Sequence, residues 1–361
     1  MKNTILIILI FFIPITGWAQ IDTILYKTLG LRGNIKSVTE FTFWAKERNK
    51  QVIKSDLCNA ASASDKEGWF EIDKSRKTNF KYEYSPSGDM RKKIIYQNVN
   101  YPFQTITYSY DRNNKIVKKN LQFILSDAHI YVYSLYEYNN DLLTSIHTYR
   151  NGEFLNKELF DYSSDDKLIE HKEVNWEGIV ECETFYTYKN GNLIKKENSC
   201  SNKDPDKIEI YGYDQLNNQT LFILRYSDGF ELIEEKFYDE KGRLIKMESP
   251  DYYIIYTYGD KDKLVESNIY SSDGNLSSES AYVYEDGRLI SKSIQEGNNK
   301  TEYKYTPQGW IESYTIIENN KKNVFLYEYE LDSNDNWIRI IEYKNTVPLK
   351  MRERTIVYFN N

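Results

Sequence analysis

One short motif recurs along this chain, and its spacing constrains the fold more than any other feature. A typical copy is "YVYEDGRL" (Tyr282 to Leu289), with two aromatic residues separated by one, then a turn, then an apolar residue. The second aromatics run from Tyr84 to Tyr329 in ten steps, a period of about 24.5 residues. Regular self-similarity at this period indicates a repeat architecture. The eleven positions are Tyr84, Tyr110, Tyr138, Tyr162, Tyr188, Tyr213, Tyr238, Tyr258, Tyr284, Tyr305 and Tyr329.

Each copy reads as two strands around a tight turn. Residues i and i+2 of a strand face the same side, so each aromatic pair places two rings on one face. Every turn has Gly, Asn or Asp at one position, the residue types that adopt positive φ most easily. The residue two positions later is apolar in every copy except at Gln219. The turn positions are Gly88, Asn114, Asp141, Asp166, Gly191, Asn217, Gly242, Asp262, Gly287, Gly309 and Asp335.

A second turn falls within each period, as in "YRNGEF" (Tyr149 to Phe154) and "YSDGF" (Tyr226 to Phe230). Two turns per period leave strands of about ten residues, which predicts an antiparallel meander of hairpins. Open sheets of more than about ten strands curl, split or close. We therefore expect an all-β fold of about eleven hairpin repeats in a curled or spiral sheet, with an aromatic ladder on one face.

The chain divides into three parts by pattern. Residues 1–19 have a positive start, an apolar core and a small-residue cleavage site, which are typical of a secretory signal peptide. Residues 20–78 are irregular apart from an initial strand over Gly33 to Phe43, and we expect them to cap the first sheet edge. Residues 79–361 form the hairpin array.

The motif resembles the YD repeat, also called the Rhs repeat. Tyr238-Asp239 with Gly242-Arg243-Leu244 is the closest match, followed by Tyr284-Glu285 with Gly287-Arg288-Leu289. The resemblance covers roughly residues 82–358. It implies a spiral β shell in a secreted or cell-surface bacterial protein, and some members of that family enclose a toxin or are linked to carbohydrate binding.

Three cysteines remain for an exported chain, namely Cys58, Cys182 and Cys200. Cys182 and Cys200 flank the turn of "YTYKNGNL". A three-residue loop at that turn places the two cysteines directly opposite each other, whereas a two-residue loop misses by one residue. A cross-strand disulfide is therefore a hypothesis, favoured by an oxidising compartment.

No residues stand out as catalytic. The three histidines have no metal-ligand spacing, and no nucleophile motif, phosphate loop or singled-out carboxylate pair is present in the sequence. We expect no enzyme activity, no metal and no cofactor. The ladder tyrosines are expected to cover one another across strands. A binding site is expected instead among five tryptophans outside the ladder, which are Trp44, Trp69, Trp176, Trp310 and Trp337.

The chain is mildly acidic, with 47 Lys+Arg against 54 Asp+Glu and a net charge of −7. This balance argues against a nucleic-acid partner, whose phosphates need a basic surface. The sequence predicts a periplasmic or extracellular, non-catalytic protein that presents a surface to a glycan or an envelope protein, without a membrane span once the signal is removed. A component or remnant of a toxin-delivery shell is the alternative.

Overall fold

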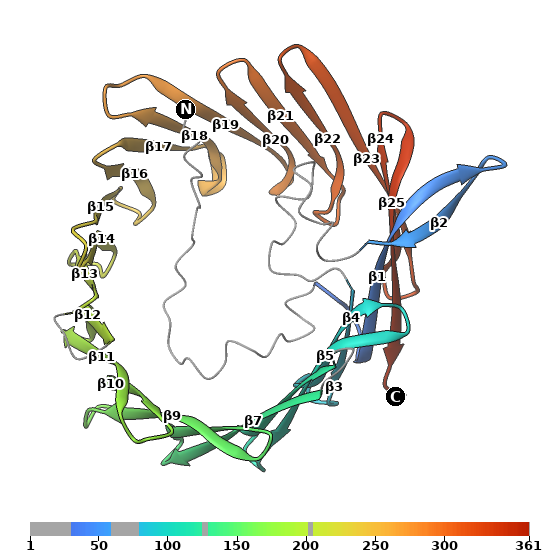
Figure 1. Ribbon diagram of the computed structural model, residues 1–361. Helices are drawn as coiled ribbons and strands as arrows, with labels where there is room; N and C mark the ends of the chain where they lie inside the picture. The colour runs from blue at the N-terminus through green and yellow to red at the C-terminus, as the bar shows by residue number, and fades with distance from the viewer. Residues whose placement is uncertain (1–29, 59–78, 125–128, 201–204, 361) are drawn as a thin grey trace.

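The computed structural model describes residues 30–58, 79–124, 129–200 and 205–360. The expected signal peptide, residues 1–19, lies outside these ranges. The described residues form one antiparallel sheet of 25 strands (Figure 1). They include one 3-10 helix (η4, Asp260–Asp262). Within the ranges described, no helix has the length and apolar character needed to cross a membrane.

The strands follow one another in chain order with short turns. The first twelve are β1 (Ile35–Arg48), β2 (Gln51–Leu57), β3 (Phe80–Tyr84), β4 (Met90–Asn98), β5 (Tyr101–Tyr110), β6 (Ile116–Ile124), β7 (His129–Asn139), β8 (Leu142–Arg150), β9 (Glu153–Tyr162), β10 (Leu168–Asn175), β11 (Val180–Lys189) and β12 (Asn192–Cys200). The others are β13 (Lys207–Tyr213), β14 (Gln219–Tyr226), β15 (Glu231–Tyr238), β16 (Leu244–Ser249), β17 (Tyr252–Tyr258), β18 (Leu264–Ser271), β19 (Leu276–Glu285), β20 (Arg288–Glu296), β21 (Asn299–Tyr305), β22 (Ile311–Glu318), β23 (Lys321–Leu331), β24 (Trp337–Lys344) and β25 (Val347–Tyr358).

The aromatic-to-turn motif forms the same hairpin from β3–β4 to β23–β24. All eleven turn positions named above have positive φ, for example 91° at Gly88 and 65° at Asn114. An aspartate after the second aromatic fixes several of these turns. Asp239 Oδ1 accepts hydrogen bonds from the backbone N–H groups of Lys241 and Arg243, both at 2.9 Å. Asp111, Asp214 and Asp332 do the same in their own turns.

A β-bulge follows each of these turns. The pairing skips one residue on the returning strand, directly after the apolar residue that closes the hairpin. In β15–β16, for example, Tyr238 pairs with Leu244 and Phe237 with Lys246, so Ile245 is extra. The same shift occurs in the other ten hairpins. Bulges bend a strand and increase its twist, so a bulge at the same end of every hairpin curves the sheet in one direction.

The second tyrosine of the motif links neighbouring hairpins. Tyr238 donates its hydroxyl hydrogen to the Gln219 carbonyl at 2.9 Å, and Tyr258 donates to the Leu244 carbonyl at 2.9 Å. In each case the acceptor is the closing residue of the preceding hairpin, where the bulge interrupts the ladder. The same bond joins Tyr110 to Met90, Tyr138 to Ile116 and Tyr329 to Ile311.

The sheet closes on itself, so the expectation of a curled or spiral sheet is wrong. β1 pairs along one edge with β25 from Ile35–Tyr358 to Trp44–Lys350, and along its other edge with β3. All strands except β2 belong to this ring, which therefore has 24 strands (Figure 1). The segment expected to cap an edge supplies β1, the strand that joins the two ends of the sheet.

A buried ion pair lies at the closing seam. Arg354 Nε donates to Glu40 Oε2 at 2.8 Å, and the two side chains are 2% and 4% exposed. The Arg354 guanidinium also lies 3.4 Å from the centre of the Trp337 ring. Near this pair, Leu31 and apolar residues of β1 and β3 to β6 form a buried cluster, made of Leu31, Ile35, Val38, Phe80, Tyr82, Tyr84, Met90, Tyr108 and Ile116.

Removing one partner of the seam ion pair should destabilise the protein strongly. Glu40→Ala leaves the Arg354 charge buried, and the expected loss is about 3–5 kcal/mol of unfolding free energy. Glu353→Ala is the matched control, because Glu353 pairs with Lys54 at 2.7 Å on the surface and its loss should cost about 0–1 kcal/mol. Denaturant unfolding measures both, and equal losses would contradict a role for the buried pair in closure.

The half-buried tyrosines should make the protein sensitive to alkali. Burial raises the pKa of Tyr110 and of Tyr186 to about 12, above the value of about 10 for tyrosine in an unfolded chain. The stabilisation is therefore complete below about pH 10 and is lost as the pH rises toward 12. Tyrosinate absorbance and circular dichroism, followed together, should show late ionisation that accompanies unfolding. Full ionisation near pH 10 with the fold retained would contradict the buried ladder.

Candidate functional site

The β11–β12 hairpin has two different faces. Tyr186 and Tyr188 lie on one, which we call the tyrosine face. Because side chains alternate along a strand, Glu183 and Phe185 lie on the other, which we call the opposite face. The register then places Glu197 across from Phe185 and Ser199 across from Glu183. Residues from two strands therefore meet on the opposite face.

A disulfide holds this hairpin together from the tyrosine face. Cys182 and Cys200 are directly opposite in the register, with an S–S distance of 2.09 Å. The loop has two residues, since Lys189 pairs with Asn192, and this register alone would miss the cysteine pair by one residue. The bulge after Leu193 restores the missing residue and brings the two cysteines into line.

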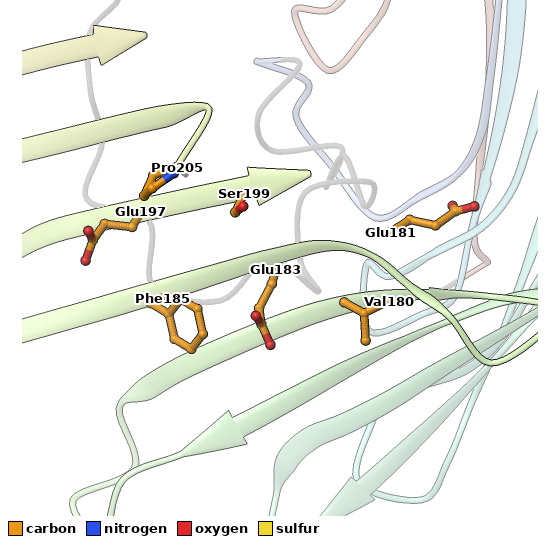
Figure 2. A pocket seen from close by; sticks show the side chains of 7 residues that line it. All are labelled: Val180, Glu181, Glu183, Phe185, Glu197, Ser199 and Pro205. Carbon is orange, nitrogen blue, oxygen red and sulfur yellow. The ribbon is translucent and has the colours of Figure 1, made fainter. Parts of the chain in front are cut away.

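A shallow pocket of about 360 Å³ lies on the opposite face of the same hairpin. Its lining consists of Val180, Glu181, Glu183, Phe185, Glu197, Ser199 and Pro205 (Figure 2). The volume falls in the range of small-ligand sites. Three carboxylates and a hydroxyl supply hydrogen-bonding groups, and the Phe185 ring, 41% exposed, supplies an aromatic surface. This combination suits a ligand that has both hydroxyl groups and an apolar face.

Neighbouring side chains fix the pocket carboxylates. Lys172 of β10 reaches Glu183 at 3.2 Å, and hydrogen bonding to Glu170 raises the lysine's pKa. Lys195 pairs with Glu197 at 2.7 Å. These pairs hold the acceptor oxygens in place, and the lysines add cationic donors at the edge of the pocket.

Trp176 lies in the turn that joins β10 to β11, four residues before the pocket-lining Val180. Its side chain is 67% exposed. Asn175, the preceding residue, donates from Nδ2 to Glu181 Oε1 at 3.2 Å and so ties the turn to the pocket lining. Among the four of the five expected tryptophans that the structure describes, Trp176 is the nearest in the chain to the pocket-lining residues.

Three other tryptophans pack against residues of the seam or of nearby strands. Trp337 is 7% exposed beneath Arg354. Trp44 lies under Lys350, whose Nζ is 5.1 Å from the ring centre, and Trp310 stacks on Tyr329 at 5.1 Å. Trp69 lies outside the described residues. The expected group of binding tryptophans is therefore divided between two parts of the ring.

The pocket residues themselves were not foreseen from the sequence. The signal that could have revealed them is the disulfide register, because it fixes which residues of β11 and β12 share a face. The five glycines expected at turns, Gly88, Gly191, Gly242, Gly287 and Gly309, all lie in hairpin turns at the opposite end of the barrel from Trp176. Within the part of the chain described, no group of three or more His, Cys, Asp or Glu is arranged to hold a metal ion.

Comparison with known proteins gives weak structural similarity. No protein-family model matches the sequence, and no curated protein matches it. A TcdB2-TccC3-TEV crystal structure is similar over 77% of this chain and 16% of that chain, at 14% identity and a TM-score of 0.45. A Photorhabdus luminescens Tc holotoxin pore is similar over 77% of this chain and 18% of that one, at 13% identity and a TM-score of 0.40.

A crystal structure of a porin-like protein from Bacteroides uniformis is similar over 63% of this chain and 95% of the porin-like chain, at 11% identity and a TM-score of 0.27. The chain thus spans less than a fifth of the toxin structures that it resembles. These TM-scores are low, so the similarities carry no argument about fold or function. No family model supports the resemblance to YD repeats.

The three cysteines should differ sharply in reactivity. Peptide mapping of exported protein without reduction should recover Cys182 and Cys200 as a linked pair. Cys58 is 3% exposed, and burial raises its pKa to about 11, so alkylation at neutral pH should require unfolding. Native labelling at Cys58, or free thiols at Cys182 and Cys200, would contradict the structure.

Proposed function

We propose that this protein is an exported, non-catalytic β-barrel whose β11–β12 pocket binds a glycan. The observation that carries the proposal is the pocket itself, where exposed Phe185 lies beside carboxylates held by lysines, with exposed Trp176 in the adjoining β10–β11 turn. Aromatic faces stack on sugar rings, and carboxylates accept hydrogen bonds from sugar hydroxyls. An envelope protein is the other class of partner for the same surface.

The tyrosine ladder has a structural role in this proposal. Its second tyrosines use their hydroxyl groups to bond the preceding hairpin, as Tyr238 does with Gln219. Their rings are partly buried and some stack with neighbours, as Tyr329 does on Trp310 at 5.1 Å. A ring occupied in this way offers little surface to a ligand, which favours the pocket over the ladder as the binding site.

Two observations support a barrel that works in water in an oxidising compartment. Charged residues occupy both faces within the strands. Lys195 pairs with Glu197 on the opposite face, and Lys196 lies 5.9 Å from the Tyr186 ring on the tyrosine face. A membrane barrel needs an uncharged band toward lipid. The Cys182–Cys200 disulfide is typical of exported proteins.

A toxin-delivery shell is a second candidate, favoured by the closed ring. At about 4.8 Å per strand, a ring of 24 strands has a perimeter of about 115 Å and a diameter of about 37 Å before tilt is counted. Barrels of 16 to 18 strands already leave an aqueous channel, so this ring is wide enough to enclose a guest.

A titration of the mature protein against a panel of bacterial and host polysaccharides tests the glycan proposal. We expect saturable binding to one glycan class, by tryptophan fluorescence and calorimetry. Trp176→Ala and Phe185→Ala should each weaken binding about tenfold or more, since a stacked aromatic is a typical hot spot. Phe237→Ala is the matched control, because Phe237 is 40% exposed on the same face but outside the pocket.

The outcome separates the candidates. Binding that survives both pocket substitutions would place the site elsewhere. A complete lack of binding across the panel would contradict the glycan proposal and would favour a protein partner or an enclosed guest.

A further inference from the structure

The two ends of the barrel differ in chemistry. The turns that follow the aromatic motif lie at one end, and they are tied together by polar contacts such as Arg243 Nη1 to Asp262 Oδ1 at 2.6 Å. The intervening turns lie at the other end, which we call the distal rim. Most of the strongly exposed apolar residues at the described turns lie on the distal rim, including Tyr101, Trp176, Phe230, Leu276 and Val347, whereas Leu216, the most exposed at 70%, lies at the other end. A gathering of exposed apolar residues on one surface is typical of an interaction site.

Charge is also divided along the distal rim. Four consecutive turns, from β14–β15 to β20–β21, each carry an exposed acidic residue, namely Asp228, Asp251, Asp273 and Glu296. We call them the acidic arc. The next three turns carry more basic than acidic residues, with Lys321 and Lys322 beside Glu318 at β22–β23, Lys344 at β24–β25, and Arg48 and Lys50 beside Glu47 at β1–β2. We call them the basic arc (Figure 1).

Turns at equal distances on the two sides of the boundary between the arcs carry opposite charges or matching apolar residues. Successive distal turns are two strands apart, or about 10 Å. Counting outward from the boundary between β21 and β22, Glu296 corresponds to Lys321 and Lys322 at the first step. Exposed Leu276, at 53%, corresponds to exposed Val347, at 64%, at the second step. Asp251 corresponds to Arg48 and Lys50 at the third, where the β1–β2 hairpin projects away from the ring (Figure 1).

We propose that the distal rim is a docking surface for a second copy of this chain, placed by a two-fold axis at the boundary of the two arcs. Such an axis brings three of the four acidic turns onto basic turns of the other copy, and Leu276 onto Val347, twice over. This is an isologous interface, in which the same patch serves both protomers. The β10–β11 turn, next to the β11–β12 pocket, lies outside the two arcs.

Sedimentation of the mature protein over a range of concentrations and salt tests this proposal. We expect a monomer–dimer equilibrium that weakens as salt rises, because the matched charges are exposed to solvent. Asp251→Lys with Asp273→Lys and Glu296→Lys replaces the acidic residue by a basic one at the three acidic turns nearest the boundary. Lys50→Glu with Lys321→Glu and Lys322→Glu reverses the charge of three residues of the basic arc. Each triple variant alone should dimerise at least about tenfold more weakly, since like charges then face each other.

The decisive sample is an equimolar mixture of the two triple variants, which should form a heterodimer because a basic rim then meets an acidic one. Glu240→Lys, an exposed change at the other end of the barrel, should leave dimerisation unchanged. Circular dichroism checks that each variant is folded. A wild-type protein that is monomeric at every concentration, or triple variants that do not associate when mixed, would overturn the proposal.

Discussion

An antiparallel sheet has two edges, and the pairing of β1 with β25 removes both. Unpaired N–H and C=O groups on an exposed edge recruit other chains, so a sheet of this length needs a way to end. Here the strand that precedes the repeats pairs with the last strand on one side and with the first hairpin on the other. The Glu40–Arg354 ion pair lies across this junction, and its two residues are 314 positions apart in the chain. The remaining architecture depends on that closure.

The repeat supplies the curvature that brings the two ends together. Each hairpin has a positive-φ turn, a bulge on the returning strand, and a tyrosine hydroxyl that bonds the previous hairpin near its bulge, as Tyr258 does at Leu244. The bulge gives the bend and the tyrosine ties one bend to the next. The same bulge sets the register of β11 and β12, which aligns Cys182 with Cys200 and brings Glu197 and Phe185 together in the pocket. The device that curves the barrel therefore also shapes the candidate site.

Local features were predictable from the sequence because they depend on neighbours in the chain. Alternating aromatics and Gly, Asn or Asp at turns determine strands and turns within a few residues, and the structure has hairpins there. Closure was not predictable in this way, because it depends on a small curvature summed over many strands and on pairing between residues such as Val38 and Ile356. The choice between two cysteine registers stayed open because it depended on a bulge. The sequence did hold one signal for that bulge, in addition to the turn pattern. The residue after the closing position is often Ile or Val, as at Ile245, and it is the extra residue of the bulge.

Cross-linking of the seam tests closure most directly. Thr39 of β1 lies opposite Thr355 of β25, and neither side chain is fully buried. A closed ring predicts that Thr39→Cys with Thr355→Cys forms an intramolecular disulfide under mild oxidation, recovered as a linked peptide pair. Thr315→Cys with Val324→Cys, opposite each other in β22–β23, is the positive control. Free thiols at the seam, with the control pair linked, would show that the sheet is open and would contradict the account.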